Sequence, residues 1–219
     1  MYLNYFYIKT KIFHENMDDI ILIGSGGHAR ACIDVIELSG EFKVAGFVEK
    51  DKATRKSNLG YPLIGSDADL QKIIQKYRNV LIGVGQIKSP KSRIKLFDLL
   101  KKIGYRFPTI VSPKAYVSKQ AHVGEGTIVM HDAMVNTNSI VGKNCIINNK
   151  SLIEHDTTIG DHCHVSTGVI MNGQVRIGEG CLIGSGAIIS NSITIGNNCI
   201  IGAGVVVKND VKAKQIIKH

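Results

Sequence analysis

Residues 151–168, SLIEHDTTIGDHCHVSTG, carry three of the eight histidines of this 219-residue chain, together with three acidic residues. His155 stands between Glu154 and Asp156, and His164 follows nine residues later. A neutral imidazole accepts a proton near pH 7, and a neighbouring carboxylate can fix its tautomer and stabilise the imidazolium that forms. The segment therefore indicates a general base with a carboxylate partner. The competing interpretation, for any single histidine, is a solvated turn residue.

An aliphatic residue or Met171 recurs at every sixth position from Val111 to Val207, seventeen times in succession. A hexapeptide repeat of this kind predicts a parallel β-helix, in which each hexad supplies one short strand and one turn. Three hexads complete one triangular coil. The inward period continues unbroken through residues 151–168, so we expect the polar side chains there to occupy outward or turn positions of intact coils.

Two further sets of residues repeat at the coil length of eighteen. Four cysteines at this spacing are predicted to stack, one per coil, as small buried hydrophobes. A metal or disulfide role is disfavoured, because the spacing is that of the coil and no C-x-x-C pair occurs. Three small residues predict a narrow strip that admits an extended ligand arm, with plain turn residues as the alternative. The cysteines are Cys145, Cys163, Cys181 and Cys199, and the small residues are Thr167, Ser185 and Ala203.

The hydrophobic pattern of residues 20–104 predicts a parallel sheet of βαβ type. Gly24, Gly26 and Ala29 match the G-x-G-x-x-G/A loop of dinucleotide-binding folds, and the free N–H groups of the helix that follows suit a phosphate or a polar nucleotide. About 90 residues precede the solenoid, too few for a complete doubly wound NAD domain. The expected strands are 20–24, 43–48 and 79–85, and the expected helices are 28–40 and 89–104.

Four segments taken together, GSGGHA, GFVEKD, IGVGQ and IEHDTTIGDHCHVS, resemble one group of hexapeptide-repeat acetyltransferases over residues 17 to about 217. The group includes the bacterial N-acetyltransferases of nucleotide-linked amino sugars in the bacillosamine and perosamine pathways, and the sialic acid O-acetyltransferase relatives. The resemblance implies an α/β Rossmann-like domain at residues 17–108 and an all-β left-handed parallel β-helix at residues 109–219. Residues 1–16 are expected to be an extension. A homotrimer with active sites between subunits, acetyl-CoA as cosubstrate and no metal are also implied.

The same resemblance assigns roles to individual residues. His155 is implied as the general base and Asp156 as the residue that raises its basicity, with Glu154 as the alternative orienting carboxylate. His164 is implied to contact the acetyl-thioester end of acetyl-CoA, and Asn148 to lie near the acceptor amine. The remaining implied contacts are Ser185 and Ala203 with the coenzyme, and Gly26, Gly27, His28, Glu49, Lys50 and Gly85 with the nucleotide-sugar.

Some features depart from the group or have no implied role. Lys50 stands where relatives carry an acidic residue, and Gln86 where Asn or Asp is usual, so the identity of the nucleotide stays open. The chain ends in KQIIKH rather than in a G-x-P-A-K-like segment that would help to cover the coenzyme. His162 is expected on the surface, and His131 is weighed only as a neighbour of the site.

Composition limits the partners. The formal net charge of +9 suits an anionic ligand such as a nucleotide or coenzyme A. Lys and Arg are dispersed, with no dense basic run and no aromatic interleaving, so nucleic acid is not expected. No apolar run approaches the roughly 20 residues of a membrane-spanning helix, and the first sixteen residues lack the apolar run of a signal peptide. A cytoplasmic protein without membrane insertion is therefore expected.

The resulting prediction is an acetyl-CoA-dependent N-acetyltransferase that acts on the amino group of a nucleotide-linked amino sugar. A UDP-4-amino-4,6-dideoxy-N-acetylhexosamine is the expected type, used for bacterial surface glycan or glycoprotein sugar biosynthesis. Two alternatives stay open. One is a sialic acid-type sugar O-acetyltransferase, and the other is a non-catalytic solenoid scaffold or nucleotide sensor.

Overall fold

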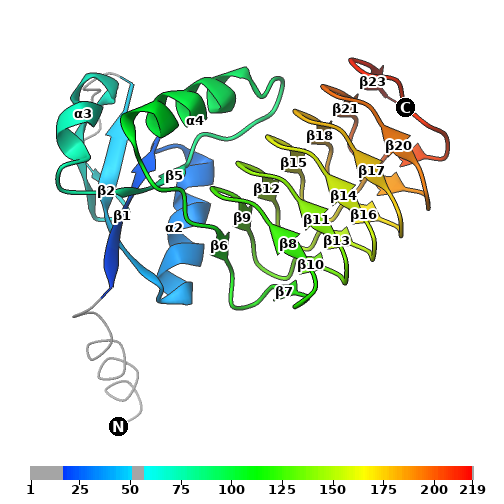
Figure 1. The fold of residues 1–219 in the computed structure, drawn as a ribbon, viewed down its shortest axis with the longest axis horizontal. Helices are drawn as coiled ribbons and strands as arrows, with labels where there is room; N and C mark the ends of the chain where they lie inside the picture. Colours follow the sequence, from blue (N-terminus) through cyan, green and yellow to red (C-terminus); the bar gives the residue numbers. More distant parts are fainter. Residues whose placement is uncertain (1–16, 51–56, 219) are drawn as a thin grey trace, which may run out of the picture.

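The computed structural model describes residues 17–50 and 57–218, so the expected extension at residues 1–16 lies outside the described part. An α/β domain occupies one end of the molecule, and a triangular prism of short strands extends from it to the carboxyl terminus (Figure 1). Among the described residues, no helix is long and apolar enough to cross a membrane.

The α/β domain contains a five-stranded sheet in the order β3-β4-β2-β1-β5. All neighbouring strands are parallel except the pair β3 and β4, which is antiparallel. The second half of β1, residues 20–23, is a run of buried apolar residues because both of its faces are covered, as is usual in parallel sheets. The strands are β1 (Asp18–Ile23), β2 (Phe42–Glu49), β3 (Ser57–Asn58), β4 (Tyr61–Ser66) and β5 (Asn79–Ile82).

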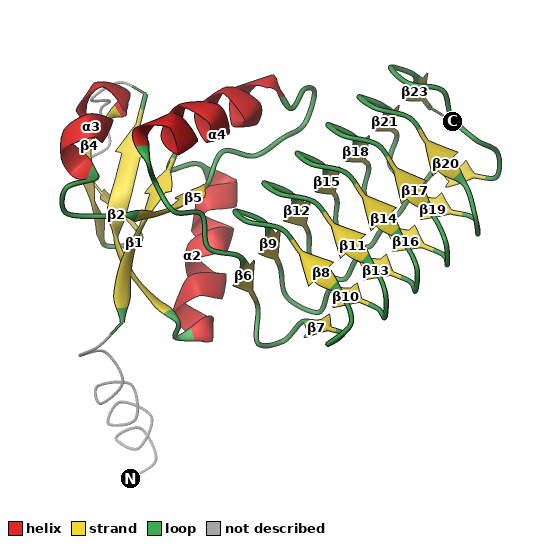
Figure 2. Cartoon of the chain, viewed as in Figure 1, coloured by secondary structure: helices red, strands yellow, loops and turns green. Residues whose placement is uncertain are grey.

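Helices cover the two faces of this sheet (Figure 2). They are α2 (Gly27–Ser39), the 3₁₀ turn η1 (Asp67–Asp69), α3 (Leu70–Ile73) and α4 (Lys91–Ile103). Alternate residues of β1 separate the two layers, because Ile20 and Leu22 pack with α2, whereas Ile21 and Ile23 pack with α3 and α4. Both long helices end where expected, at Gly40 and Gly104 in the left-handed conformation that glycine adopts readily.

The expected parallel sheet and its two long helices are confirmed, with shifts of a few residues at their ends. Strands β3 and β4 and the short helix α3 were not expected from the sequence. Strand β4 contains Pro62 and Gly65, residue types that weaken a strand pattern, and α3 is a single turn.

The prism is a parallel β-helix in which each inward residue is the second residue of a two-residue strand. Its strands form three sheets, named here after one member each: the β15 face, the β13 face and the β14 face. The β15 face consists of β6 (Ile110–Val111), β9 (Ile128–Val129), β12 (Ile146–Ile147), β15 (His164–Val165), β18 (Leu182–Ile183), β21 (Ile200–Ile201) and β23 (Ile216–Ile217). The β13 face consists of β7 (Tyr116–Val117), β10 (Met134–Val135), β13 (Leu152–Ile153), β16 (Ile170–Met171), β19 (Ile188–Ile189) and β22 (Val206–Val207). The β14 face consists of β8 (His122–Val123), β11 (Ile140–Val141), β14 (Thr158–Ile159), β17 (Arg176–Ile177) and β20 (Thr194–Ile195).

The interior of the prism confirms the six-residue period. Fourteen of the seventeen inward positions are buried, and Val111, Val117 and Val123 are only partly buried, because they belong to the first coil, at the end of the stack. Each buried aliphatic side chain contributes about 1.5–3 kcal/mol of transfer free energy. The four repeating cysteines are buried and stacked as expected, and the Cys163 N–H donates to the Sγ of Cys145 at 3.4 Å.

The α/β domain docks on the β15 face. Outward residues of its first strands, Ile110, Ile128 and Ile146, share a core with α2 and β1. Arg93 of α4 is buried in the same junction, where it donates to the carbonyl oxygens of Ile82 and Val84 at 2.8 and 2.6 Å. Its other amino group donates to the backbone and side-chain oxygens of Asn144, at 3.2 and 2.7 Å. Burial lowers the pKa of Arg93 to about 10, so the guanidinium stays charged at neutral pH.

Candidate active site

His155 lies at the corner where the chain passes from β13 to β14, and its side chain is 49% exposed. Its Nδ1 is 2.7 Å from Oδ2 of Asp156, so the ring donates its Nδ1 proton there and keeps the Nε2 lone pair as an acceptor. This hydrogen bond, with a second from Asn138, lowers the pKa of Asp156 and keeps its carboxylate ionised at neutral pH. The pair has the arrangement that a general base requires.

The neighbouring acid on the other side of His155 has a different partner. Oε2 of Glu154 accepts a hydrogen bond from Nδ2 of Asn136 at 2.9 Å, and the carboxylate that contacts the imidazole is that of Asp156. Of the two carboxylates that the sequence analysis considered, Asp156 has the geometry of the orienting residue.

Gly173 is a residue of this corner that the sequence analysis missed. It lies one coil above His155, and a Cβ built on it would stand 2.7 Å from Cε1 and 2.8 Å from Nε2 of the imidazole. The glycine therefore leaves open the ring edge that would receive a proton. The signal was present in the sequence, because 173 is 155 plus the coil length of eighteen.

The glycine loop of the α/β domain opens into a cavity of about 750 Å³. The loop begins at the carboxyl end of β1 and leads into α2, whose N-cap, Gly26, has no side-chain capping bond. The carboxylate of Glu49, which accepts a hydrogen bond from Ser25, lines the same cavity. Five of the implied substrate residues meet here, Gly26, Gly27, His28, Glu49 and Gly85, whereas Lys50 is exposed and Asn148 lies on the solenoid, and neither lines the cavity.

His164 projects outward from β15 toward the α/β domain. Its Nδ1–H donates to the carbonyl oxygen of Gln86 at 2.6 Å, which leaves Nε2 as the acceptor of a 3.3 Å hydrogen bond from Nδ2 of Asn148. Burial is the main cause that lowers the pKa of His164, and it lowers the pKa of the nearby His28 to about 3. The positive charge of Arg93 acts in the same direction on both. Both rings are therefore neutral hydrogen-bonding groups at physiological pH.

Because His28 and His164 are buried in the neutral form, we expect the folded protein to lose stability in acid. In the unfolded chain each would take up a proton near pH 6.5, whereas in the folded chain each resists protonation until a lower pH. The unfolded state then binds more protons, so the free energy of unfolding falls as pH drops below 6.5, by up to about 1.4 kcal/mol per pH unit for each group. Thermal unfolding between pH 7 and 4 measures this slope. His28→Gln is expected to make the slope shallower, and an unchanged slope in that variant would contradict the assignment.

The three small residues proposed as a ligand strip lie where the chain turns from the β15 face to the β13 face. Thr167, Ser185 and Ala203 are all exposed, and backbone hydrogen bonds stack their turns in register. The Gly186 N–H donates to the Thr167 oxygen at 2.9 Å, and the Gly204 N–H to the Ser185 oxygen at 2.8 Å. The strip starts three residues after His164, so it is continuous with the neighbourhood of that imidazole.

Two other histidines, His162 and His131, lie where the solenoid meets the α/β domain. The surface position expected for His162 is wrong: its half-buried ring packs edge-on against Phe97 of α4, with centroids 5.5 Å apart, and Nδ1 accepts a hydrogen bond from Asn144. His131 accepts a hydrogen bond from Ser112 and donates to Asp34 of α2, which makes it a contact between solenoid and domain. Across residues 17–50 and 57–218, no group of three or more His, Cys, Asp or Glu side chains could hold a metal ion.

Within one chain, the two halves of the implied site lie on different sides of the prism. His155 and Asp156 occupy the corner between the β13 and β14 faces. The cavity and His164 lie at the β15 face, which carries the α/β domain.

A solenoid of hexapeptide coils with an oriented imidazole on its outer wall has the features expected of a hexapeptide-repeat acyltransferase. Profiles of two families match: the PglD N-terminal domain over residues 19–100, and the hexapeptide repeat of succinyl-transferase over residues 137–172 and 174–209. The structure is similar to perosamine N-acetyltransferase from Caulobacter crescentus in complex with CoA and GDP-perosamine, with a TM-score of 0.85 and 31% identity over 92% of this chain and 93% of that one. It is also similar to the acetyltransferase domain of PglB from Neisseria gonorrhoeae in complex with acetyl coenzyme A, with a TM-score of 0.84 and 27% identity over 92% and 96% of the two chains.

A third similar structure is WeeI from Acinetobacter baumannii, with a TM-score of 0.81 and 25% identity over 93% of this chain and 97% of that one. No curated protein sequence matches. The chain belongs to the hexapeptide-repeat acetyltransferases of the sugar O-/N-acetyltransferase group, with their left-handed β-helix. It is an acetyl-CoA-dependent acetyltransferase, which sets aside a non-catalytic scaffold or sensor.

Proposed function

We propose that the protein acetylates the amino group of a nucleotide-linked amino sugar of the UDP-4-amino-4,6-dideoxy-N-acetylhexosamine type. The observation that carries the proposal is the hydrogen-bonded pair of His155 and Asp156, with the Nε2 edge of the ring left open below Gly173. A similar enzyme of known structure binds CoA and GDP-perosamine, itself a nucleotide-linked amino sugar. The cavity at the helix N-terminus suits the phosphates of such a sugar.

The residues support a direct transfer. Nε2 of His155 accepts a proton from the attacking amine as its nitrogen bonds to the thioester carbonyl carbon. Asp156 accepts the Nδ1 hydrogen bond throughout and stabilises the imidazolium. Collapse of the tetrahedral intermediate breaks the carbon–sulfur bond, and the leaving thiolate takes the proton held by the His155 imidazolium, which gives free coenzyme A and the N-acetyl sugar and restores the neutral base. His164, whose two ring nitrogens already have partners, orients the thioester end rather than moving protons.

An assembly that joins a base of one copy to the cavity of another would complete the site. The outward residues of the β13 face are all apolar or aromatic, and several are well exposed, which supports a contact between copies at this face. The β15 face carries the α/β domain, and the β14 face exposes polar groups such as Arg176 and Thr194. We therefore place the interface of a homotrimer on the β13 face. The residues of the stripe are Tyr116, Met134, Leu152, Ile170, Ile188 and Val206.

Mixed oligomers test this arrangement. His155→Ala lacks the base, and Gly27→Trp is designed to fill the cavity, so each variant alone is expected to lose most of its activity. When the two are unfolded and refolded together, sites formed by an intact base and an intact cavity are expected to return, and activity with them. If native mass spectrometry verifies mixed trimers and they recover no activity, a site shared between copies is contradicted.

Transfer assays with acetyl-CoA and a panel of acceptors test the function itself. UDP- and GDP-linked amino sugars are expected to be acetylated on nitrogen, as mass spectrometry of the product would show. A free or CMP-linked sialic acid acetylated in preference would instead support O-acetylation. No transfer to any amino sugar would refute the proposal.

A further inference from the structure

Two asparagines of the coil below His155 bind the two carboxylates that flank it in the sequence. Nδ2 of Asn136 donates to Oε2 of Glu154 at 2.9 Å, and Nδ2 of Asn138 donates to Oδ1 of Asp156 at 3.3 Å. Each asparagine precedes its partner by eighteen residues, which is one coil. The two carboxylates therefore have separate partners, and it is Asp156 that contacts the imidazole.

The carboxylate of Asp156 is held at both of its oxygens. Oδ1 accepts the hydrogen bond from Asn138, and Oδ2 lies 2.7 Å from Nδ1 of His155. The rotation of an Asp carboxylate about its Cβ–Cγ bond has a broad preference, and water competes for an exposed one, so a fixed donor is needed to set it. Because the group is planar, a donor on Oδ1 also places Oδ2. The orientation of the imidazole therefore depends on Asn138 through Asp156.

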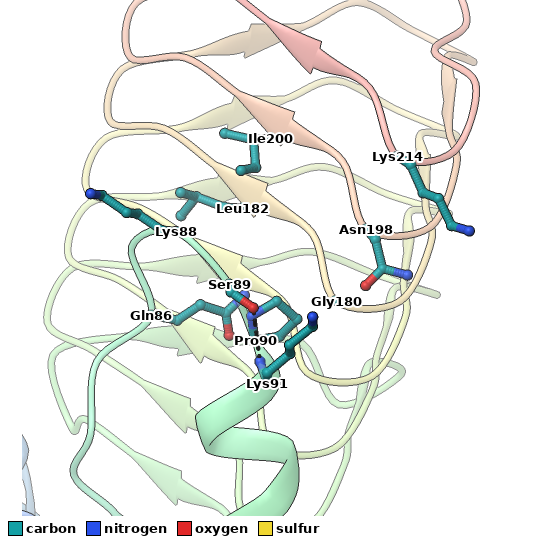
Figure 3. Close-up of a pocket in the computed structure, with 10 residues that line it drawn as sticks. All are labelled: Gln86, Lys88, Ser89, Pro90, Lys91, Gly180, Leu182, Asn198, Ile200 and Lys214. Carbon is teal, nitrogen blue, oxygen red and sulfur yellow. Dashed lines mark hydrogen bonds between the residues drawn. The ribbon is translucent and has the colours of Figure 1, made fainter.

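The turn that contains Asn138 does not itself require an asparagine. Its φ of 55° lies in the left-handed region, which Asn tolerates and Gly adopts without cost. Glycine takes the equivalent turn position at other corners of the solenoid. Figure 3 shows such a corner, where Gly180, Asn198 and Lys214 follow one another on successive coils with φ values of 68°, 58° and 64°. The side chain at 138 is therefore available for a role beyond the turn.

We propose that Asn138 is a positioning residue for the base, because its amide holds the carboxylate of Asp156 in the orientation that accepts the Nδ1 proton of His155. Asn136 binds Glu154 in parallel, so the base is paired with one of its two neighbouring carboxylates. The Nε2 lone pair then keeps the direction that proton transfer requires. This inference rests on the proposed function, since it takes His155 as the base.

A double-mutant cycle in the full-length protein tests this role. Asn138→Gly removes the amide and keeps the left-handed turn, so the fold should survive. Its kcat is expected to fall about 3–10-fold, the effect of one exposed hydrogen bond, with KM for both substrates within about twofold of the parent. In an Asp156→Gly background, which has no carboxylate to hold, the same change should alter kcat by less than about twofold. Steady-state kinetics of the four proteins measures the coupling.

Ser192→Gly is the matched control, because Ser192 occupies the same corner two coils above Asp156, with a left-handed φ of 60°. Its Oγ donates to Oε1 of Gln174 at 3.0 Å, again across eighteen residues. The substitution removes an exposed hydrogen bond between coils, as Asn138→Gly does, but leaves the contacts of Asp156 in place. Its kcat should equal that of the parent. An equal loss in this control would assign the effect to the corner as a whole and overturn the role of Asn138.

NMR of the His155 ring nitrogens gives a readout that does not depend on activity. At a pH where the ring is neutral, the parent should favour the tautomer protonated on Nδ1, and Asn138→Gly should lower that population whereas Ser192→Gly should not. An unchanged tautomer population or an unchanged kcat in Asn138→Gly, or an equal loss of kcat in the Asp156→Gly background, overturns the assignment. If the parent transfers acetyl to no amino sugar, the proposed function fails, and the tautomer populations still decide whether Asn138 positions the ring.

Discussion

Replacing His155 by Ala is expected to lower kcat by about 10²–10⁴-fold, the range that loss of a positioned general base produces. The coenzyme's dissociation constant should not change, because the proposed role of the ring concerns the acceptor's proton and not the binding of the coenzyme. Thermal stability should also stay close to that of the parent, since the side chain is half exposed and its hydrogen bond is to an exposed carboxylate. Steady-state kinetics measures kcat, titration calorimetry measures the dissociation constant, and scanning calorimetry measures the thermal stability.

The matched control is His122→Ala, which removes an exposed imidazole from the outer wall of the same solenoid. Its turnover should equal that of the parent. The turnover of Asp156→Asn should lie between those of His155→Ala and His122→Ala. An amide can still accept the Nδ1 hydrogen bond, but it no longer carries the charge that stabilises the imidazolium. Turnover by His155→Ala within about threefold of the parent would remove His155 from the role of base.

Gly173→Ala is expected to lower kcat by about 10–10³-fold although it adds only a methyl group. The new Cβ would stand 2.7–2.8 Å from Cε1 and Nε2 of His155, closer than such atoms can approach. The imidazole must then turn away, which breaks its hydrogen bond to Asp156 and misplaces the accepting nitrogen. Gly173 has no positive φ, so the backbone accepts alanine without strain and the fold should survive.

Asn191→Ala serves as the control for this change, because Asn191 is the exposed residue one coil further along the same corner. It should leave both kcat and the melting temperature unchanged. The imidazole's proton-exchange and chemical-shift behaviour by NMR would show whether the Asp156 contact is lost in Gly173→Ala. An unchanged kcat in that variant would mean that the Nε2 edge is not where the acceptor approaches.

The solenoid was predictable because its structure repeats along one dimension. The inward residue of each hexad, the stacking of Cys145 over Cys163 and the outward position of His155 all follow from the six- and eighteen-residue periods. The glycine loop before α2 was predictable for a similar reason, since a turn of this kind is built from consecutive residues. The position of each of these residues is set by residues next to it in the sequence or eighteen positions away, so it can be predicted from the repeat.

What only the tertiary structure decided is how the α/β domain sits on the β15 face. The contacts of Arg93 with Asn144, of His164 with Gln86 and of His162 with Phe97 join residues that are 51, 78 and 65 positions apart. No periodicity relates the two segments. The docking is set by the packing of α2 and β1 against Ile110, Ile128 and Ile146, together with these contacts of α4 and of the loop after β5. The six- and eighteen-residue periods therefore determine the wall that carries His155, whereas burial by residues distant in sequence decides that His28 and His164 are kept neutral.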